Sequence, residues 1–233
     1  MRKLSNFKQT VVDRCKTQVS FIHGEEFCNR LLIILNERRN DMVILIGGAS
    51  CTGKTTMAQR LLEKYRIPYL SIDHLKMGLI RGNRYCDFTA TDGDDELTNK
   101  LWPIVKGIIK TNIENDQNII IEGCYIPTDQ VKDFEAEYRE HIITLYIGFS
   151  ELYIEKHFST GIIEHRSETE FKDIDDYMNA NYFKEAHRKQ RVACEREGLP
   201  FFEVNEDYVR DLRKAYEWID EQVIERKILR YNK

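Results

Sequence analysis

Short apolar runs alternate with helical patterns through most of the chain. The runs lie at residues 42–46, 68–72, 118–121, 142–147 and 200–204, and the clearest of them consist almost entirely of Val, Ile and Leu. Near-continuous apolar runs of this length are typical of strands that are buried on both faces. Because strands that are separated by helices form parallel sheets, we predict a three-layer α/β/α sandwich with a five-stranded parallel sheet.

Helical patterns fill most of the intervals, at residues 54–65, 97–115, 174–197 and 207–227. The most loop-like stretch is Arg81–Asp95, and connections of this length often carry function. The residues before the first apolar run are largely polar and contain one apolar helical face. We therefore divide the chain into a helical N-terminal extension, residues 1–40, and one α/β domain, residues 41–233.

A glycine-rich segment directly after the first apolar run carries the most specific motif in the chain. The residues GASCTGKT match the pattern GxxxxGK[ST] in full. The two glycines allow backbone torsions that turn successive N–H groups towards an anion, and the helix that follows adds the positive charge of its N-terminus. In this pattern the lysine reaches the β- and γ-phosphates, and the next hydroxyl is placed to ligate Mg²⁺. We predict phosphate binding by Gly48, Ala49, Ser50, Cys51, Thr52, Gly53, Lys54, Thr55 and Thr56.

The composition mainly excludes or disfavours other classes of protein. The chain has 233 residues, of which 42% are hydrophobic and 32% charged, which is enough apolar material for a core and too much for a disordered chain. A net charge of −4 disfavours nucleic acid as a partner, because phosphate contacts need Lys and Arg. No apolar run approaches the roughly 18–20 residues of a membrane span. Six cysteines without a CxxC pair indicate reduced thiols, so we expect a cytoplasmic protein.

The phosphate loop and the second apolar run together resemble a known family. A strand, the loop GGASCTGKTT, a helix and a second strand that ends in Asp73 are similar to the P-loop small-molecule and nucleotide kinases, over roughly residues 41–205. The nearest resemblance is to adenylate-kinase-like and 2-phosphoglycerate-kinase-like proteins, which are related to zeta-toxin and chloramphenicol-phosphotransferase types. The resemblance implies a P-loop NTPase kinase fold with strand order 2-3-1-4-5, ATP as donor, and a helical lid at about residues 150–197.

Two carboxylates follow strands of the predicted sheet. In several such kinases an Asp at the end of the second strand contacts the acceptor hydroxyl and takes its proton, which implies this role for Asp73. A carboxylate at this edge can orient a hydroxyl in line with the γ-phosphate, although capping of the next helix also explains an Asp here. Glu122 follows the third apolar run at a position similar to a Walker B acid. It is predicted to hold Mg²⁺ or touch the acceptor, with a helix cap or a solvated turn as the alternative.

Cations must close over the transferred phosphoryl group, because its transition state spreads negative charge. Arg166 is the first choice for this role, since it follows a break at Gly161 in the predicted lid. Arg81 and Arg84 lie where such kinases bind the acceptor and are predicted to bind an anionic one, unless they only contribute charge near a helix C-terminus. The other cations of the predicted lid are Lys156, His157, Arg188 and Arg191.

We predict an ATP- and Mg²⁺-dependent phosphotransferase that moves the γ-phosphoryl group to a hydroxyl or phosphate of a small metabolite or nucleotide. The alternatives are a toxin-type kinase of nucleotide sugars or nucleic acids, and a nucleotide-binding regulator without phosphotransfer. The chain lacks an NKxD motif after an apolar strand, which argues against a GTPase switch. Residues 1–40 could form a homodimer face or cover a sheet edge. The predicted sets are Lys54, Asp73 and Arg166 for catalysis, Thr55 and Glu122 for the metal, and Asp73, Arg81, Arg84 and Glu122 for the acceptor.

Overall fold

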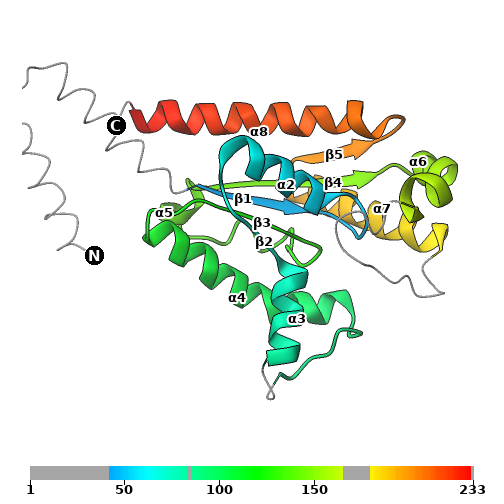
Figure 1. The fold of residues 1–233 in the computed structure, drawn as a ribbon, viewed down its shortest axis with the longest axis horizontal. Coiled ribbons are helices and arrows are strands. Elements are labelled where there is room, and N and C mark those ends of the chain that lie inside the picture. The colour runs from blue at the N-terminus through cyan, green and yellow to red at the C-terminus, as the bar shows by residue number, and fades with distance from the viewer. Residues whose placement is uncertain (1–41, 83–85, 165–178, 232–233) are drawn as a thin grey trace, which may run out of the picture. The chain divides into compact units, whose positions relative to one another are not determined.

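The structure confirms the predicted α/β architecture. The computed structural model describes residues 42–82, 86–164 and 179–231. Five strands form one parallel sheet in the order β2-β3-β1-β4-β5, which is the order that the kinase resemblance implies (Figure 1). The strands are β1 (Val43–Gly47), β2 (Tyr69–Ser71), β3 (Ile119–Gly123), β4 (Ile142–Phe149) and β5 (Phe201–Val204).

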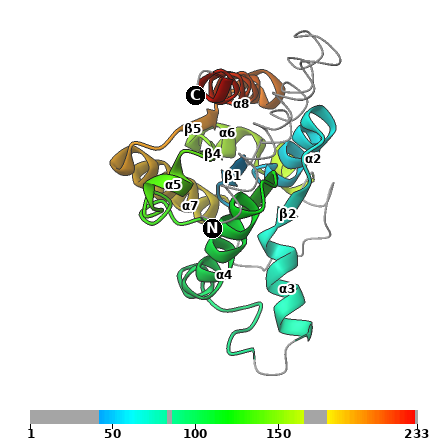
Figure 2. The same ribbon diagram turned by 90° about the vertical axis from the view of Figure 1, so that its left-hand side faces the viewer.

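Helices cover both faces of the sheet, as the second view shows (Figure 2). In the central strand, Ile44 and Ile46 pack in the core that includes α2 (Lys54–Tyr65) and α8 (Tyr208–Tyr231), whereas Val43 and Leu45 pack in the core that includes α4 (Asp94–Glu114). All residues of this strand are buried, which explains why its sequence is apolar without alternation. The helices are α2 (Lys54–Tyr65), α3 (Ile72–Gly82), α4 (Asp94–Glu114), α7 (Ala180–Glu197) and α8 (Tyr208–Tyr231).

The bounds of several elements differ from the prediction. Ile72 was expected to end a strand, but it begins α3, and Asp73 adds a favourable negative charge to the first turn of that helix. In the same way α4 begins at Asp94, because three acidic residues in its first turn favour a helix N-terminus there. The helix predicted from residue 174 is described from Ala180 onwards, and its earlier part lies outside the described residues.

Three short elements were not predicted separately: α5 (Ala136–Arg139), α6 (Glu151–His157) and the π-helix η1 (Phe158–Ile163). The side chain of Ser150 caps α6 by accepting a hydrogen bond from the backbone N–H of Tyr153 at 3.1 Å. Within the described parts of the chain, no helix is both long and apolar enough to cross a membrane. The predicted extension, residues 1–40, lies outside the described residues, so the division of the chain stays a prediction.

Candidate active site

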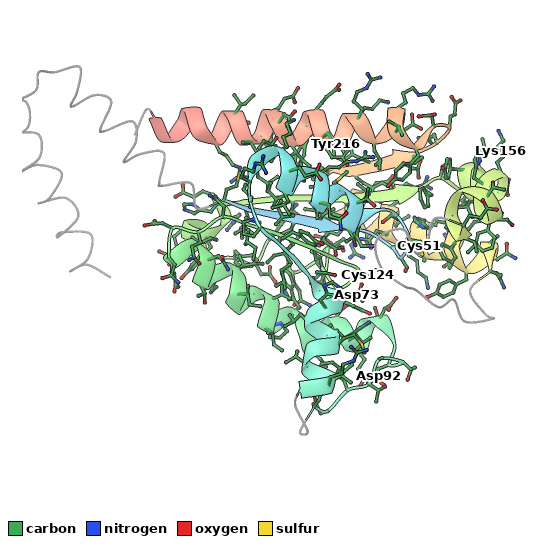
Figure 3. The ribbon with its side chains drawn as sticks, viewed as in Figure 1. Cys51, Asp73, Asp92, Cys124, Lys156 and Tyr216 are labelled. Carbon is green, nitrogen blue, oxygen red and sulfur yellow. The ribbon has the colours of Figure 1, made fainter. Side chains whose placement is uncertain are left out.

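The carboxyl ends of three neighbouring strands bring the predicted site residues to one edge of the sheet. β1 and β3 end in register with each other, and Ser71 of β2 pairs with Glu122 of β3. The segments that leave these strands therefore start at the same edge, where Figure 3 shows Cys51, Asp73 and Cys124. Ligands bind at this edge in open α/β sheets.

The phosphate loop joins β1 to α2 and has backbone conformations that favour glycine. The φ angle is 146° at Gly48 and 83° at Gly53. A Cβ atom would overlap the backbone carbonyl oxygen of Ile147 at the first position and the hydroxyl group of Tyr208 at the second. Backbone torsion and the space available therefore both require the two glycines of the motif.

Lys54 is buried beside the loop and holds its positive charge there. Its Nζ donates to the carbonyl oxygen of Ala49 at 2.7 Å and to Thr52 Oγ1 at 3.5 Å, and the side chain is almost fully enclosed. The hydroxyl group of Thr52 donates to the same carbonyl oxygen at 3.0 Å. A buried lysine next to the N-terminus of a helix fits an oligophosphate anion, as the motif predicts.

Thr55 and Glu122 form a buried pair of oxygen ligands beneath the phosphate loop. The hydroxyl group of Thr55 donates to Glu122 Oε1 at 3.2 Å, and the two residues are 8% and 1% exposed. Mg²⁺ prefers a few protein oxygens together with phosphate oxygens and water. A hydroxyl and a carboxylate at this distance, next to a phosphate-binding loop, therefore fit an Mg²⁺ ion that protein and nucleotide hold jointly.

Asp73 lies in the first turn of α3 and is paired with a lysine on the same helix. Lys76 Nζ lies 3.1 Å from Asp73 Oδ1, as the i,i+3 spacing allows. The same Nζ donates to the phenol oxygen of Tyr125 at 2.8 Å and lies 5.0 Å from the centroid of that ring. Lys76 and Tyr125 are buried, while Asp73 is partly exposed. Lys76 was not predicted from the sequence, although its spacing from Asp73 was a usable signal.

Asp94, the first residue of α4, is a second carboxylate near Asp73 and Lys76. The residue as a whole is exposed, yet desolvation of its carboxyl group raises its pKa. Among its neighbours, Lys76 and Lys54 lower this pKa and Asp73 raises it, so all three charges lie within electrostatic reach. From the sequence, Asp94 was expected only as part of a long loop and of an acidic run that caps the next helix, and no motif indicated a role in a site.

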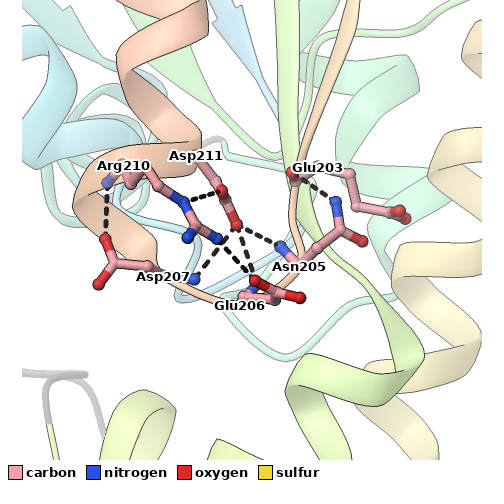
Figure 4. Close-up of polar contacts among 6 residues, drawn as sticks. All are labelled: Glu203, Asn205, Glu206, Asp207, Arg210 and Asp211. Carbon is pink, nitrogen blue, oxygen red and sulfur yellow. Dashed lines mark hydrogen bonds and ion pairs between the residues drawn. The ribbon is translucent and has the colours of Figure 1, made fainter.

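A short loop between β5 and α8, residues 205–207, lies next to the phosphate loop. Tyr208, which begins α8, donates its hydroxyl hydrogen bond to the backbone oxygen of Thr52 at 3.3 Å. The loop is held by Asp211, whose Oδ2 accepts three consecutive backbone N–H groups at 2.9, 2.9 and 3.2 Å (Figure 4). These hydrogen bonds hold the pKa of Asp211 well below its usual range. The carboxylate therefore orders the loop that supports Tyr208.

His187 on α7 is a buried group that the sequence analysis also missed. Its Nδ1 accepts the backbone N–H of Phe149 at 3.0 Å, so the neutral ring carries its proton on Nε2. Burial and the positive charge of Lys54 lower the pKa of His187 to about 3. The imidazole is therefore neutral at physiological pH and packs against the rings of Phe149 and Phe183.

Of the cations predicted for the lid and the acceptor, those that the structure describes are exposed, paired with an acidic side chain or packed against a ring. Arg81 is exposed at the C-terminal end of α3, and Lys156 is exposed on α6 (Figure 3). His157 packs against the ring of Tyr153, with 4.6 Å between the centroids. On α7, Arg188 and Arg191 pair with acidic side chains, Glu185 at 2.6 Å and Glu203 at 3.3 Å.

Arg84 and Arg166 lie outside the described residues. The roles predicted for them in acceptor binding and in closing over the phosphoryl group therefore stay predictions.

The sheet order, the phosphate loop and the carboxylates at the same edge together define a P-loop kinase fold. The sequence matches the model of the zeta toxin family over residues 30–214. Because this match covers most of the chain, the protein belongs to the zeta toxin family. No match was found among curated proteins.

Several solved structures are similar to the chain at low sequence identity. A protein from Eubacterium ventriosum is 17% identical, with 78% of this chain and 99% of that chain covered and a TM-score of 0.47. Shikimate kinase from Bacteroides thetaiotaomicron is 12% identical, with coverages of 77% and 98% and a TM-score of 0.46. A gluconokinase from Sinorhizobium meliloti is 12% identical, with coverages of 83% and 96% and a TM-score of 0.44.

Proposed function

We propose that the protein is an ATP- and Mg²⁺-dependent phosphotransferase that moves the γ-phosphoryl group to a hydroxyl group of a small metabolite. One observation carries the proposal: the buried Thr55–Glu122 pair, beside a loop shaped for phosphates, lies at the same sheet edge as Asp73. Groups suited to the donor and a carboxylate suited to the acceptor therefore lie at the same edge of the sheet. Membership of a family of P-loop kinases supports phosphotransfer in general.

Each of these residues has a proposed role. Lys54 and the loop N–H groups bind the β- and γ-phosphates of the donor. Thr55 and Glu122 hold Mg²⁺, which when bound neutralises charge on the two terminal phosphates. Asp73 accepts a hydrogen bond from the acceptor hydroxyl and orients its oxygen in line with the γ-phosphorus. As the new O–P bond forms and the bond to the bridging oxygen of ADP breaks, the hydroxyl proton passes to the Asp73 carboxylate.

The cations that stabilise the transferred group are part of the proposal as well. Arg166 is the proposed lid residue over the γ-phosphate, and Arg81 and Arg84 are proposed to bind an acceptor that carries negative charge. Single alanine variants of these arginines separate the two roles. Loss of the lid residue should lower kcat, whereas loss of an acceptor-binding residue should raise the KM for the acceptor only.

The test is ATP consumption with Mg²⁺ against a panel of acceptors, with the Lys54→Ala protein as the blank. The panel contains nucleoside monophosphates, nucleosides, phosphoglycerates, sugars and chloramphenicol- or aminoglycoside-like hydroxyl compounds. Turnover with one acceptor, absent in the blank, supports the proposal and names the acceptor class. Tight ATP binding without turnover on any acceptor would favour a nucleotide-binding regulator instead.

A toxin-type kinase of nucleotide sugars is a second candidate, which the family match specifically favours. It predicts that induced expression of the protein arrests bacterial growth and that the Asp73→Asn protein, produced at the same level, does not. It also predicts transfer of phosphate from ATP to a nucleotide sugar in the purified system. Normal growth together with no turnover on nucleotide sugars would exclude this candidate.

A further inference from the structure

The acceptor side of the site contains a buried lysine to which the proposed mechanism gives no role. Lys76 is 9% exposed and contacts two polar groups, the Asp73 carboxylate at 3.1 Å and the Tyr125 phenol at 2.8 Å. A buried ammonium group is costly unless it is paired and hydrogen-bonded. These contacts therefore fix where the charge of Lys76 lies, and they place it against the carboxylate of the proposed base.

Tyr125 is suited to anchor this lysine. It is 5% exposed, and its ring lies 5.0 Å from Lys76 Nζ, within the range of a cation–π contact. Burial raises the pKa of Tyr125, and the negative charges of Asp73 and Asp94 add to this effect. The phenol therefore stays protonated and accepts the hydrogen bond from Lys76 as a neutral group.

The chain contains a second lysine with the same types of partner, which provides a comparison. Lys110 on α4 lies 2.8 Å from the carboxylate of Glu135 and 4.8 Å from the ring centroid of Tyr138. Its side chain is 28% exposed, and the side chain of Glu135 is 58% exposed, so water screens this pair. The side chains of Lys76 and Asp73 are 11% and 23% exposed, so the charge of Lys76 acts more strongly on its partner.

We propose that Lys76 is a positioning residue for phosphoryl transfer: anchored by Tyr125, it holds the Asp73 carboxylate ionised and oriented towards the acceptor hydroxyl. The inference rests on the proposed function, since it assigns Asp73 to the acceptor. Without Lys76, the nearby carboxylate of Asp94 would favour the protonated form of Asp73, which can neither accept the hydroxyl proton nor orient the group as an anion. The charged or titratable groups that act electrostatically on Asp94 or Tyr125 are Lys54, Asp73, Lys76, Asp95, Cys124 and Tyr182, and Glu122 lies on β3 opposite Ser71 of β2.

The first experiment follows the titration of Asp73 by NMR in the full-length protein labelled with ¹³C at the aspartate carboxyl carbons. The Asp73→Asn protein assigns the signal. We expect the titration midpoint to rise by about 1–3 pH units in the Lys76→Met protein and to stay near its original value in the Lys76→Arg protein. The Lys110→Met protein is the matched control and should leave the midpoint unchanged. An unchanged midpoint in the Lys76→Met protein would overturn the proposal.

The second experiment measures turnover of the acceptor that the panel identifies. Lys76→Met should lower kcat by about 10-fold or more, leave the KM for ATP unchanged and move the acid limb of the pH–rate profile to higher pH. Lys76→Arg should restore most of the rate. If Asp73→Asn is inactive while Lys76→Met keeps the normal rate and profile, the inference fails and the proposed function stands. If Asp73→Asn is fully active, the assignment of Asp73 itself fails.

Discussion

The phosphate loop and the acceptor side lie at one edge of the sheet but are built in different ways. The loop is one continuous segment, residues 48–56, whose conformation depends on positive φ angles at Gly48 and Gly53. The acceptor side combines side chains from α3, α4 and the segment after β3, with the charge of Lys76 at its centre. The comparison shows that the proposed donor site is a local backbone structure, whereas the proposed acceptor site depends on the packing of separate elements.

The two regions also differ in how a ligand would be held. Around the phosphate loop, Lys54 and the helix N-terminus provide positive charge for an anion. On the acceptor side, Lys76 already binds Asp73 and Tyr125, and Asp94 contributes a further carboxylate. The loop therefore offers positive charge to a phosphate group, whereas on the proposed acceptor side the carboxylates of Asp73 and Asp94 offset the charge of Lys76.

The largest expected effect comes from the loop. Lys54→Ala removes the buried cation that we propose binds the terminal phosphates, so turnover should fall by about 10³-fold or more. Circular dichroism and thermal unfolding should show a folded protein. Lys64→Ala, at the exposed end of the same helix, is the control and should keep full activity. Equal loss of activity in both proteins would contradict a specific role for Lys54.

The next largest effect is on the acceptor side. Asp73→Asn keeps the shape of the side chain but removes its capacity to take a proton, so kcat should fall by about 10²- to 10⁴-fold. ATP affinity, measured by calorimetry, should not change, because the residue lies outside the phosphate loop. The control is Asp87→Asn, an exposed carboxylate that pairs with Lys100. Undiminished turnover in the Asp73→Asn protein would refute its assignment.

Substitutions at two glycines test whether the conformation of the loop depends on its backbone torsions. Gly53→Ala forces a Cβ atom into the Tyr208 hydroxyl at a positive φ, so it should destabilise the protein by about 1–3 kcal/mol and weaken nucleotide binding. Gly107→Ala lies in α4 with no atom near the new Cβ, and it should stabilise the protein by up to about 1 kcal/mol. Urea unfolding measures the free energy of unfolding of both variants. Similar effects of the two substitutions on the free energy of unfolding would contradict a special requirement for glycine at position 53.

The smallest expected effect concerns the loop at residues 205–207. Asp211→Ala removes the acceptor of three backbone N–H groups, so the melting temperature should fall by a few degrees, about 0.5–2 kcal/mol by analogy with helix caps. Glu217→Ala on the same helix is the control. The pKa of Asp211 is depressed in the folded protein, so its contribution is complete above the unfolded value of about 4 and disappears as the pH falls towards the folded value. A difference between the two variants that grows on acidification would contradict this account.

The structure confirms the architecture that the sequence predicted, and the phosphate loop has the positive φ angles that its two glycines allow. The run Val43–Gly47 is buried on both faces, so its apolar composition directly reports its position in the sheet. The phosphate loop is a local structure, and its pattern of glycine, lysine and threonine carries its geometry. The strand order came from the family resemblance, because the apolar pattern of a strand does not indicate which other strands pair with it.

The acceptor side was predicted less completely. Asp73 was found because it follows a strand, and Tyr125 was expected near the floor of the pocket. Lys76 was not assigned a role, since its meaning depends on a contact with Tyr125, 49 positions away along the chain. Arg81 was selected because it follows the helix after Asp73, and Arg188 and Arg191 because they lie in the predicted lid. The structure shows Arg81 exposed and the other two paired with acidic side chains, so their roles stay predictions. Charge in a sequence does not say which way a side chain faces.

The sequence by itself determined the strands, the phosphate loop and the acid that follows the second strand, because each depends on residues that are near one another along the chain. Only the tertiary structure decided that Thr55 meets Glu122, that Lys76 lies between Asp73 and Tyr125, and that Tyr208 supports the loop. The physical reason is that these contacts join separate elements. Sheet order and helix packing fix their distances, and no local pattern encodes either.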